Sequence, residues 1–271
     1  PSKALIRSAR FLRSLKEAQS LGVRSATADW SFADVMERVQ RVVQAVEPHD
    51  SVARYEALGV ECLAGTAKIV TPYSVEVQTP QGSRTLTTRN IVIAAGARPF
   101  VPPIPGIEAM DVLTSDNVWS LRELPRRLVV LGGGPIGCEL AQAFARLGAQ
   151  VTQVEMLPRL LIREDPEISE RVLAQFRAEG VDVRLAHKAV RFAIEGAGKA
   201  LYCEANGQAV RLPFDAVLCA VGRVANTTGY GLEALGIPVT TARTVEVNEY
   251  LQTVYPNIYA CGDVAGPYQF T

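Results

Sequence analysis

The sequence predicts an α/β fold in which helices pack on a doubly wound parallel sheet. Apolar runs of strand length alternate with segments of helical periodicity between Arg127 and Ala220, as is typical of a parallel sheet with helical crossovers. In the segment Arg127–Leu131 the apolar residues are continuous, as expected for a strand buried on both faces. A glycine-rich turn follows this strand, and a second strand follows the next helix.

Length and composition restrict the possible functions. A chain of 271 residues is long enough for about two domains. Its 28 basic and 28 acidic residues cancel, so we expect no nucleic acid and no membrane as a partner, because both favour a positive surface. No apolar run approaches the ~18 residues of a membrane-spanning helix. The first residues also lack the pattern of a signal peptide.

The cysteines favour a reducing compartment. They are odd in number and scattered, so neither a disulfide framework nor a metal-ligand spacing is predicted. We therefore expect reduced thiols, no metal and a cytoplasmic location. The five residues are Cys62, Cys138, Cys203, Cys219 and Cys261.

The first third of the chain begins with helices. Ser31 is expected to cap a helix over residues 32–46, where apolar residues follow the 3.6 period, and Glu47-Pro48 ends it. Residues 2–21 predict a weaker helix with a basic outer face. Shorter patterns then predict strands at Val60–Leu63, Ala67–Thr71, Tyr73–Gln78 and Asn90–Ala94. Four prolines between Arg98 and Gly106 predict a stiff connector.

The middle of the chain reads as consecutive βαβ units. A helix is expected over Ile136–Leu147 and a strand over Val151–Glu155. Asp165 is expected to cap the next helix, which has a proline in its first turn and ends at Glu179-Gly180. Short strands follow and end with Phe214–Ala220.

The glycine-rich turn matches G-x-G-x-x-G at Gly132, Gly134 and Gly137. In this strand–turn–helix context it predicts a dinucleotide site. Gly132 permits the tight turn, Gly134 lets a pyrophosphate approach the backbone, and Gly137 lets the helix pack on the strand. The helix N-terminus then presents N–H groups to the phosphates. The alternative is a tight turn without a ligand.

An acid at the end of the next strand bears on the choice of dinucleotide. Glu155 lies 18 residues after Gly137 and can accept hydrogen bonds from a ribose 2′-OH, while it repels a 2′-phosphate. NAD is therefore favoured over NADP. Arg159 could soften that repulsion, and Glu155 could instead be an ordinary exposed acid.

Two further loops follow apolar strands. Ala95-Gly96-Ala97 comes after one, and Gly262-Asp263 after Ile258–Ala260. Small residues at a strand's carboxyl end allow a flat ligand to approach the backbone, and an aspartate there can bind a hydroxyl. An ordinary turn explains both loops equally well.

These motifs, together with the proline-rich connector and Val221-Gly222-Arg223, occur in one order. The order resembles that of the FAD- and NAD(P)-dependent pyridine nucleotide–disulfide oxidoreductases over essentially the whole chain. Within the family the chain looks most like the mercuric reductase branch, on residues 139–148 and 163–168, with dihydrolipoamide dehydrogenase second. The resemblance implies a Rossmann-like NAD(P)-binding domain at 117–245, inserted in a truncated FAD-binding domain of the glutathione-reductase-like type at 1–116 and 246–271.

The resemblance also implies residue roles. Lys3 would lie beside the flavin N5 edge and pair with Glu139 near the nicotinamide, and both would be catalytic; the alternative is two surface charges. The NAD contacts implied are Gly132, Gly133, Gly134, Pro135, Ile136, Gly137, Glu155, Ala189 and Gly222. The FAD contacts implied are Lys3, Gly65, Ala95, Gly96, Ala97, Arg223, Gly262 and Asp263.

The sequence departs from the family pattern in several places. The FAD fingerprint, the redox cysteine pair and the C-terminal dimerisation domain are absent, so we interpret the chain as an internal fragment. The parent, expected to be a homodimer, would pass electrons from NAD(P)H through FAD and the cysteine pair to a small disulfide or Hg(II). The fragment itself is expected to bind NAD, to hold FAD weakly or not at all, and to be inactive. A non-catalytic NAD-binding module is the alternative.

Overall fold

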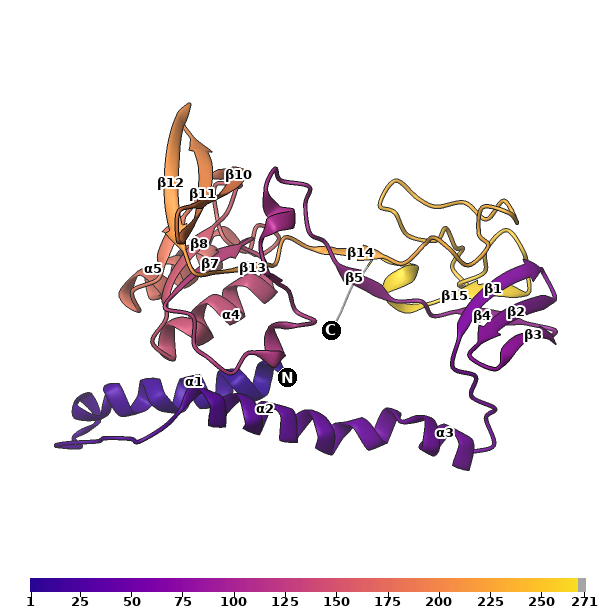
Figure 1. The fold of residues 1–271 in the computed structure, drawn as a ribbon, viewed down its shortest axis with the longest axis horizontal. Coiled ribbons are helices and arrows are strands. Elements are labelled where there is room, and N and C mark those ends of the chain that lie inside the picture. Colours follow the sequence, from indigo (N-terminus) through magenta and orange to yellow (C-terminus); the bar gives the residue numbers. More distant parts are fainter. Residues whose placement is uncertain (268–271) are drawn as a thin grey trace. The chain divides into compact units, whose positions relative to one another are not determined.

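The computed structural model describes residues 1–267, and these form two compact units (Figure 1). The first unit contains residues 1–47 and 99–222, and the second contains residues 48–98 and the described residues from 223 onward. Within residues 1–267 no helix combines the length and apolarity needed to cross a bilayer. The domains predicted from the sequence, 117–245 and 1–116 with 246–271, were defined by the cofactor that each would bind. The two units are defined by contacts within the chain, so the assignment of cofactors stays a prediction.

The first unit is built on a five-stranded parallel sheet, which confirms the predicted fold class. Its central strand pairs in register with a neighbour on each side, Leu131 opposite Val154 and opposite Cys219. Two helices provide the crossovers, α4 (Pro135–Arg146) and α5 (Pro166–Ala178). The strand order is β6 (Val112–Leu113), β13 (Ala216–Cys219), β7 (Arg127–Leu131), β8 (Gln150–Val154) and β9 (Asp182–Arg184).

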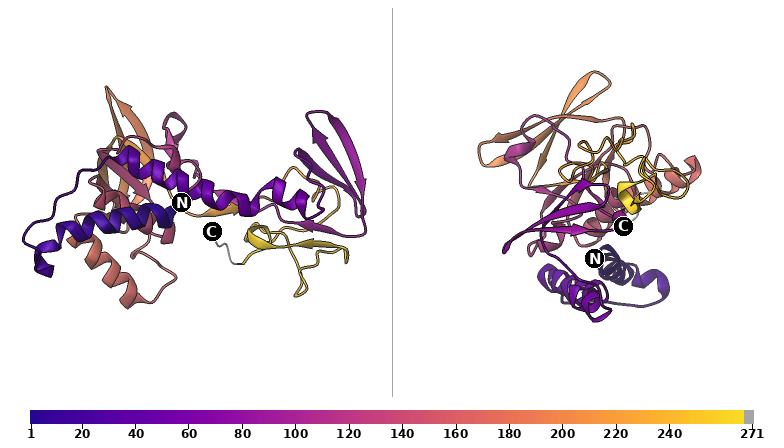
Figure 2. Two further views of the ribbon diagram at one scale, coloured as in Figure 1. Left: turned by 90° about the horizontal axis from the view of Figure 1, so that it is seen from below. Right: turned by 90° about the vertical axis from the view of Figure 1, so that its right-hand side faces the viewer.

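Helices cover one face of this sheet. The N-terminal helices α1 (Ser2–Lys16) and α2 (Phe32–Val46) lie side by side, as Figures 1 and 2 both show, and α1 packs on α4. Leu5, Met36 and Phe144 are fully buried where these helices meet. Burial of such side chains stabilises the unit by about 1.5–3 kcal/mol each, so the unit's core depends on helices that lie far before the sheet in the sequence.

A second sheet covers the other face. It is an antiparallel meander of β10 (Lys188–Glu195), β11 (Gly198–Ala205) and β12 (Gln208–Phe214). Phe192 and Phe214 meet edge to face with ring centroids 5.8 Å apart, in a core cluster that includes Val129 of β7. A 3₁₀ turn, η3 (Ile107–Ala109), follows the proline-rich connector and contributes Ile107 to the same cluster.

The second unit consists of small sheets and has its own apolar core. A meander joins β1 (Thr66–Thr71), β2 (Ser74–Thr79) and β3 (Gly82–Thr87). Two strand pairs complete it: β4 (Ile91–Ile93) with β15 (Ile258–Ala260), which are parallel, and β5 (Ala97–Pro99) with β14 (Arg223–Ala225). Ile258, Val245 and Leu232 are buried at its centre.

The remaining helical segments of the described residues are short. They are α3 (Val52–Ala57), η1 (Ala18–Leu21), η2 (Glu47–Asp50), η4 (Val118–Ser120) and η5 (Gly262–Val264).

Several element predictions are confirmed and others are wrong. Ser31 caps α2 as predicted, since its Oγ accepts a hydrogen bond from Asp34 N at 3.0 Å. Asp165 occupies the N-cap position of α5, but among the described residues its side chain makes no capping hydrogen bond. The predicted strand Val60–Leu63 is wrong, because these residues lie in irregular structure and Val60 is half exposed.

Candidate dinucleotide site

Two of the three fingerprint glycines are required by backbone packing. Gly132 has a φ of +106°, and a Cβ on it would lie 2.4 Å from the carbonyl oxygen of Ala220. A Cβ on Gly137 would lie 2.3 Å from the carbonyl oxygen of Gly132. A side chain on Gly132 would therefore collide with the backbone that follows β13, and one on Gly137 would force α4 away from the end of β7.

Gly134 has a different environment. Its φ of −76° suits any residue, and no atom of the described residues lies within 4 Å of the Cβ that a side chain would add. Gly134 is the N-cap of α4, Pro135 stands in the first turn, and that turn carries no acid. The first N–H groups of a helix have no partner inside it and carry partial positive charge. This open approach to a positive helix end fits a pyrophosphate.

Glu155 lies directly after β8, with its carboxylate against the glycine turn. Its Oε2 accepts a hydrogen bond from Gly133 N at 2.5 Å, and its Oε1 accepts one from Leu157 N at 2.8 Å. A carboxylate has about four lone-pair sites, so two backbone donors leave capacity for two hydroxyl groups. The residue is buried, with 9% of its surface exposed.

Arg159 is not directed at a ligand. Its guanidinium donates hydrogen bonds to the carbonyl oxygens of Ile162, at 3.0 Å, and of Glu164, at 2.9 Å. Those acceptors belong to the loop between β8 and α5. The arginine is therefore an internal tie of this loop.

Two side chains lie buried beneath the turn: Cys138, one of the expected reduced thiols, and Gln153, for which no role was predicted from the sequence. Gln153 Nε2 donates to the carbonyl oxygen of Gly132 at 2.9 Å, and Gln153 Oε1 has no hydrogen-bond partner among residues 1–267. The Cys138 thiol donates to the carbonyl oxygen of Gly133 at 3.4 Å, and burial raises the pKa of this thiol to about 11. It is therefore a neutral packing group. A glutamine inside an apolar strand was the available signal for Gln153.

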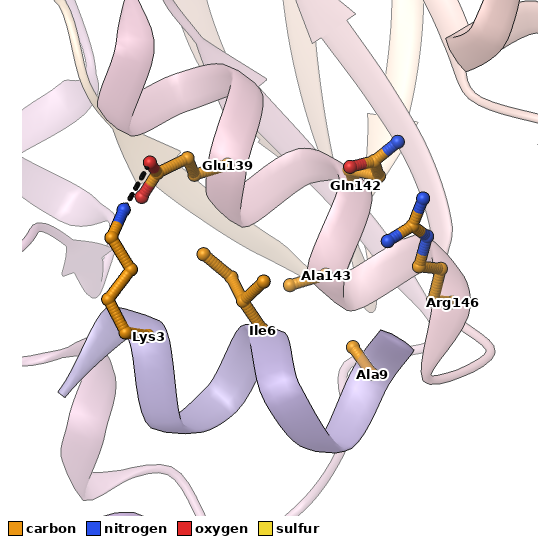
Figure 3. Close-up of a pocket in the computed structure, with 7 residues that line it drawn as sticks. All are labelled: Lys3, Ile6, Ala9, Glu139, Gln142, Ala143 and Arg146. Atoms are coloured by element: carbon orange, nitrogen blue, oxygen red, sulfur yellow. Dashed lines mark hydrogen bonds and ion pairs between the residues drawn. The ribbon is translucent and has the colours of Figure 1, made fainter. Parts of the chain in front are cut away.

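Lys3 and Glu139 form an ion pair between α1 and α4. The Lys3 Nζ lies 2.6 Å from Glu139 Oε1, and Figure 3 shows the two side chains reaching toward each other from facing helices. The Lys3 side chain is 79% exposed and that of Glu139 is 39% exposed, so the pair contributes at most about 1 kcal/mol to stability. A pocket of about 180 Å³ adjoins it, lined by Lys3, Ile6, Ala9, Glu139, Gln142, Ala143 and Arg146.

The other residues expected at the NAD site lie in different settings. Gly222 follows β13 with a φ of +133°, and its carbonyl oxygen accepts a hydrogen bond from Phe100 N. Ala189 lies in β10 opposite Cys203 and packs against the apolar cluster of the antiparallel sheet. Pro135 and Ile136 form the first turn of α4, next to the fingerprint glycines.

In the second unit, the two loops expected to contact FAD follow paired strands. Ile93 of β4 lies opposite Ala260 of β15 in a parallel pair, so the loops after them leave the same edge. Gly96 and Gly262 have left-handed φ angles of +65° and +73°, and no described atom lies within 4 Å of the Cβ position of either. Such bare backbone at a strand edge fits a flat ligand.

Arg223 ties these two loops together. Its Nη2 donates to the carbonyl oxygen of Ala97 at 2.6 Å, and its Nε lies 3.5 Å from Asp263 Oδ2. The Asp263 side chain keeps 18% of its surface exposed. The carbonyl oxygen of Ala95 accepts a hydrogen bond from Asn226 Nδ2.

Gly65 has a structural reason of its own. A Cβ there would lie 2.3 Å from the carbonyl oxygen of Gln78, so the glycine is required where the chain enters β1 beside β2. This close approach to a strand accounts for the residue without a ligand.

Comparison with known proteins gives consistent matches over the whole chain. The family model described as pyridine nucleotide-disulphide oxidoreductase matches residues 1–271. A mercuric reductase from Staphylococcus aureus is 32% identical over 268 residues, which are 98% of this chain and 48% of that protein. A dihydrolipoyl dehydrogenase from Chlorobaculum tepidum is 34% identical, over 98% of this chain and 57% of its own length.

The fold has a similarly related solved structure. The HOCl-induced flavoprotein disulfide reductase RclA from Escherichia coli aligns with a TM-score of 0.85 at 30% identity, covering 100% of this chain and 57% of that one. The chain thus spans about half the length of the relatives it matches.

Proposed function

We propose that this chain, which belongs to the pyridine nucleotide-disulphide oxidoreductase family, binds NAD at the turn between β7 and α4. The family is FAD- and NAD(P)-dependent. The observation that carries the proposal is the unobstructed N-terminus of α4 at Gly134, with the Glu155 carboxylate beside the same turn. The N-terminus binds phosphate oxygens, and the carboxylate accepts hydrogen bonds from ribose hydroxyls.

The same geometry favours NAD over NADP. A 2′-phosphate would meet the negative charge of Glu155, which is fixed in place by two backbone N–H groups. Arg159 is not directed toward such a phosphate, because its guanidinium donates to carbonyl oxygens of its own loop. Like charges brought together in a desolvated site oppose binding.

Lys3 and Glu139 are the proposed catalytic residues. When bound, the nicotinamide supplies a hydride and the flavin accepts it. A flavin held beside Lys3 would gather negative charge on reduction, and the Lys3 ammonium would stabilise that charge. Glu139 Oε1, which lies 2.6 Å from Lys3 Nζ, orients the ammonium. Lys3→Met should therefore slow the reduction of the flavin in the flavin-loaded whole protein. If the two groups were only a surface ion pair, the substitution would leave that rate unchanged.

A titration with NADH and NADPH tests the site. The wild-type chain should bind NADH more tightly, and Glu155→Ala should weaken NADH by about 1–3 kcal/mol, or roughly 5–150-fold, while NADPH changes less or improves. Arg163→Met, an exposed charge change in the following loop, is the control and should leave both affinities unchanged. Equal affinities of the wild type for the two dinucleotides would refute the NAD preference.

We also propose that residues 117–245 bind the nicotinamide dinucleotide and that residues 1–116 with 246–271 belong to the FAD-binding part. The open backbone at Gly96 and Gly262 supports the second assignment. The sequence contains one G-x-G-x-x-G, which this proposal gives to NAD. The 271-residue chain should therefore retain little FAD, and flavin absorbance that persists through gel filtration would contradict this.

For the whole protein we propose electron transfer from NAD(P)H through FAD and a cysteine pair to Hg(II) or a disulfide. Identity to mercuric reductases and to dihydrolipoyl dehydrogenases, at 32% and 34%, supports both substrates about equally. Hg(II)-dependent oxidation of the reduced dinucleotide by the whole protein would support the first, and lipoamide-dependent oxidation the second. Dinucleotide binding without either activity would favour a non-catalytic NAD-binding module.

A further inference from the structure

The loop between β8 and α5, residues 156–165, folds back over the glycine turn. Leu161 N donates a hydrogen bond to the carbonyl oxygen of Gly133 at 2.7 Å. Leu160 is fully buried, and a Cβ on Gly133 would lie 2.8 Å from its side chain. Leu161 has a left-handed φ of 49°, which is unfavourable for a residue with a Cβ. A strained contact of this kind persists only where the surrounding structure enforces it.

Arg159 supplies that enforcement from inside the loop. Besides the carbonyl oxygens of Ile162 and Glu164, its guanidinium contacts Ser169 Oγ at 3.3 Å. Ser169 is 2% exposed and lies on α5, within hydrogen-bond distance of Leu161 O at 3.4 Å. One side chain therefore joins two carbonyl oxygens of the loop to the helix that follows it, as the planar fork of an arginine allows.

The loop in turn determines where the Glu155 carboxylate lies. One carboxylate oxygen is held by Gly133 N on the glycine turn, and the other by Leu157 N at the start of the loop. The hydrogen bond from Leu161 N joins the later part of the loop to the carbonyl oxygen of Gly133. The loop is therefore attached to the glycine turn both through Glu155 and through Leu161. A shift of the loop would move Leu157 N and release one side of the carboxylate.

We propose that Arg159 is a positioning residue for dinucleotide specificity, which acts by tying the 156–165 loop against the glycine turn and thereby fixing Glu155. This inference rests on the proposed NAD site. Arg159 selects for NADH without touching it, and it is no ligand of a 2′-phosphate. Removal of Arg159 would let the Glu155 carboxylate move. NADH would then lose hydrogen bonds to its ribose hydroxyls, and the 2′-phosphate of NADPH would meet less repulsion, so the preference for NADH would fall for both reasons.

The test compares Arg159→Met with Arg163→Met in the chain. Both variants remove one positive charge from the same loop, but only the first removes the tie. Dissociation constants for NADH and NADPH are measured by fluorescence titration at constant salt. Arg159→Met should weaken NADH by about tenfold, the cost of about one well-placed hydrogen bond to a charged group. NADPH should change by less than threefold, and Arg163→Met should keep the wild-type ratio.

Limited proteolysis provides a readout independent of ligands. Cleavage within residues 156–165 should accelerate in Arg159→Met and stay at the wild-type rate in Arg163→Met. If Arg159→Met weakened NADPH alone, Arg159 would be a ligand of the 2′-phosphate and the inference would be overturned. An unchanged ratio of the two affinities would overturn it as well. Wild type that binds neither dinucleotide would remove the proposed function itself, and this inference with it.

Discussion

At the residue scale, the three fingerprint glycines serve two different purposes. Gly132 and Gly137 exclude side chains because a backbone carbonyl oxygen occupies the space, at 2.4 and 2.3 Å from the added Cβ. Gly134 faces open space instead. The sequence pattern treats all three glycines alike, but the structure separates the two that the fold requires from Gly134, which backbone packing does not require.

A matched pair of substitutions tests this separation. Gly137→Ala places a Cβ against backbone that cannot yield, and should cost about 1–3 kcal/mol of unfolding free energy. Gly134→Ala should cost less than about 1 kcal/mol, the scale of a changed N-cap, yet weaken NADH more than tenfold by obstructing the pyrophosphate. Chemical denaturation and NADH titration measure the two effects. Strong destabilisation by Gly134→Ala, or undisturbed NADH binding, would contradict the assignment.

Of the residues around the glycine turn, some could be predicted from the sequence and others could not. Glu155 could be predicted, because its position after a strand and its charge are written in the sequence. The commitment of Arg159 to carbonyl oxygens of its own loop could not, because it depends on how a loop of ten residues folds. Gln153 was missed because its side-chain hydrogen bonds reach Gly132 and Cys138, which are 21 and 15 positions away.

At the element scale, the two predicted helix caps behave differently. Ser31 Oγ accepts a hydrogen bond from Asp34 N, whereas the Asp165 side chain makes no cap bond among the described residues. Ser31→Ala should therefore cost about 1 kcal/mol of unfolding free energy. Asp165→Ala should cost only the few tenths of its interaction with the helix dipole. Equal losses in parallel denaturation curves would count against this reading.

In the second unit one predicted strand is absent and one observed strand was not predicted. A strand needs a hydrogen-bonded neighbour, and the apolar residues of Val60–Leu63 do not reveal that they lack one in the described structure. The reverse error concerns β3, whose polar sequence gives no strand signal but which pairs along its length with β2. Tertiary pairing decides both cases.

A buried carboxylate joins α5 to α4 and gives the protein a pH dependence. The Glu179 side chain is 1% exposed and is held by Arg146 through two bonds of 2.7 Å, with Gln175 donating a third. Burial alone raises the pKa of this carboxyl, but the hydrogen bonds from Arg146 and Gln175 outweigh it, so the pKa of Glu179 lies below its usual 4.5. A carboxyl with a lowered pKa stabilises the fold above the unfolded value and loses that contribution as pH falls through the folded value.

Glu179→Gln should consequently reduce the unfolding free energy by about 1–3 kcal/mol at pH 7. The difference from wild type should shrink as the pH falls below about 4.5, because the carboxyl of the unfolded wild-type chain takes up a proton before that of the folded chain does. Glu167→Gln on the same helix removes an exposed pair with Arg171 and should cost no more than about 0.5 kcal/mol. A Glu179→Gln deficit that persists unchanged into acid would show that shape, and not charge, is responsible.

At the scale of the whole molecule, the parallel sheet could be predicted because each βαβ unit is local in sequence. The packing of α1 and α2 on that sheet's helical face could not, because Leu5 and Met36 meet Phe144 across more than a hundred residues. The antiparallel cover of the opposite face was likewise seen only as short strand-like pieces. Local periodicity gives the elements, and long-range burial decides which of them share a core.

Separate cores allow the location of the dinucleotide site to be tested. Leu128 lies in the core of the first unit and Ile258 in that of the second, 1% and 0% exposed. Either residue changed to Ala should cost about 2–5 kcal/mol within its own unit. Gly134, Glu155 and the 156–165 loop all belong to the first unit, so Leu128→Ala should weaken NADH binding strongly. Ile258→Ala should lower the unfolding temperature instead. Measured well below that temperature, its dissociation constant for NADH should stay within about twofold of the wild-type value. Comparable loss of NADH binding in both variants would place part of the site outside the first unit.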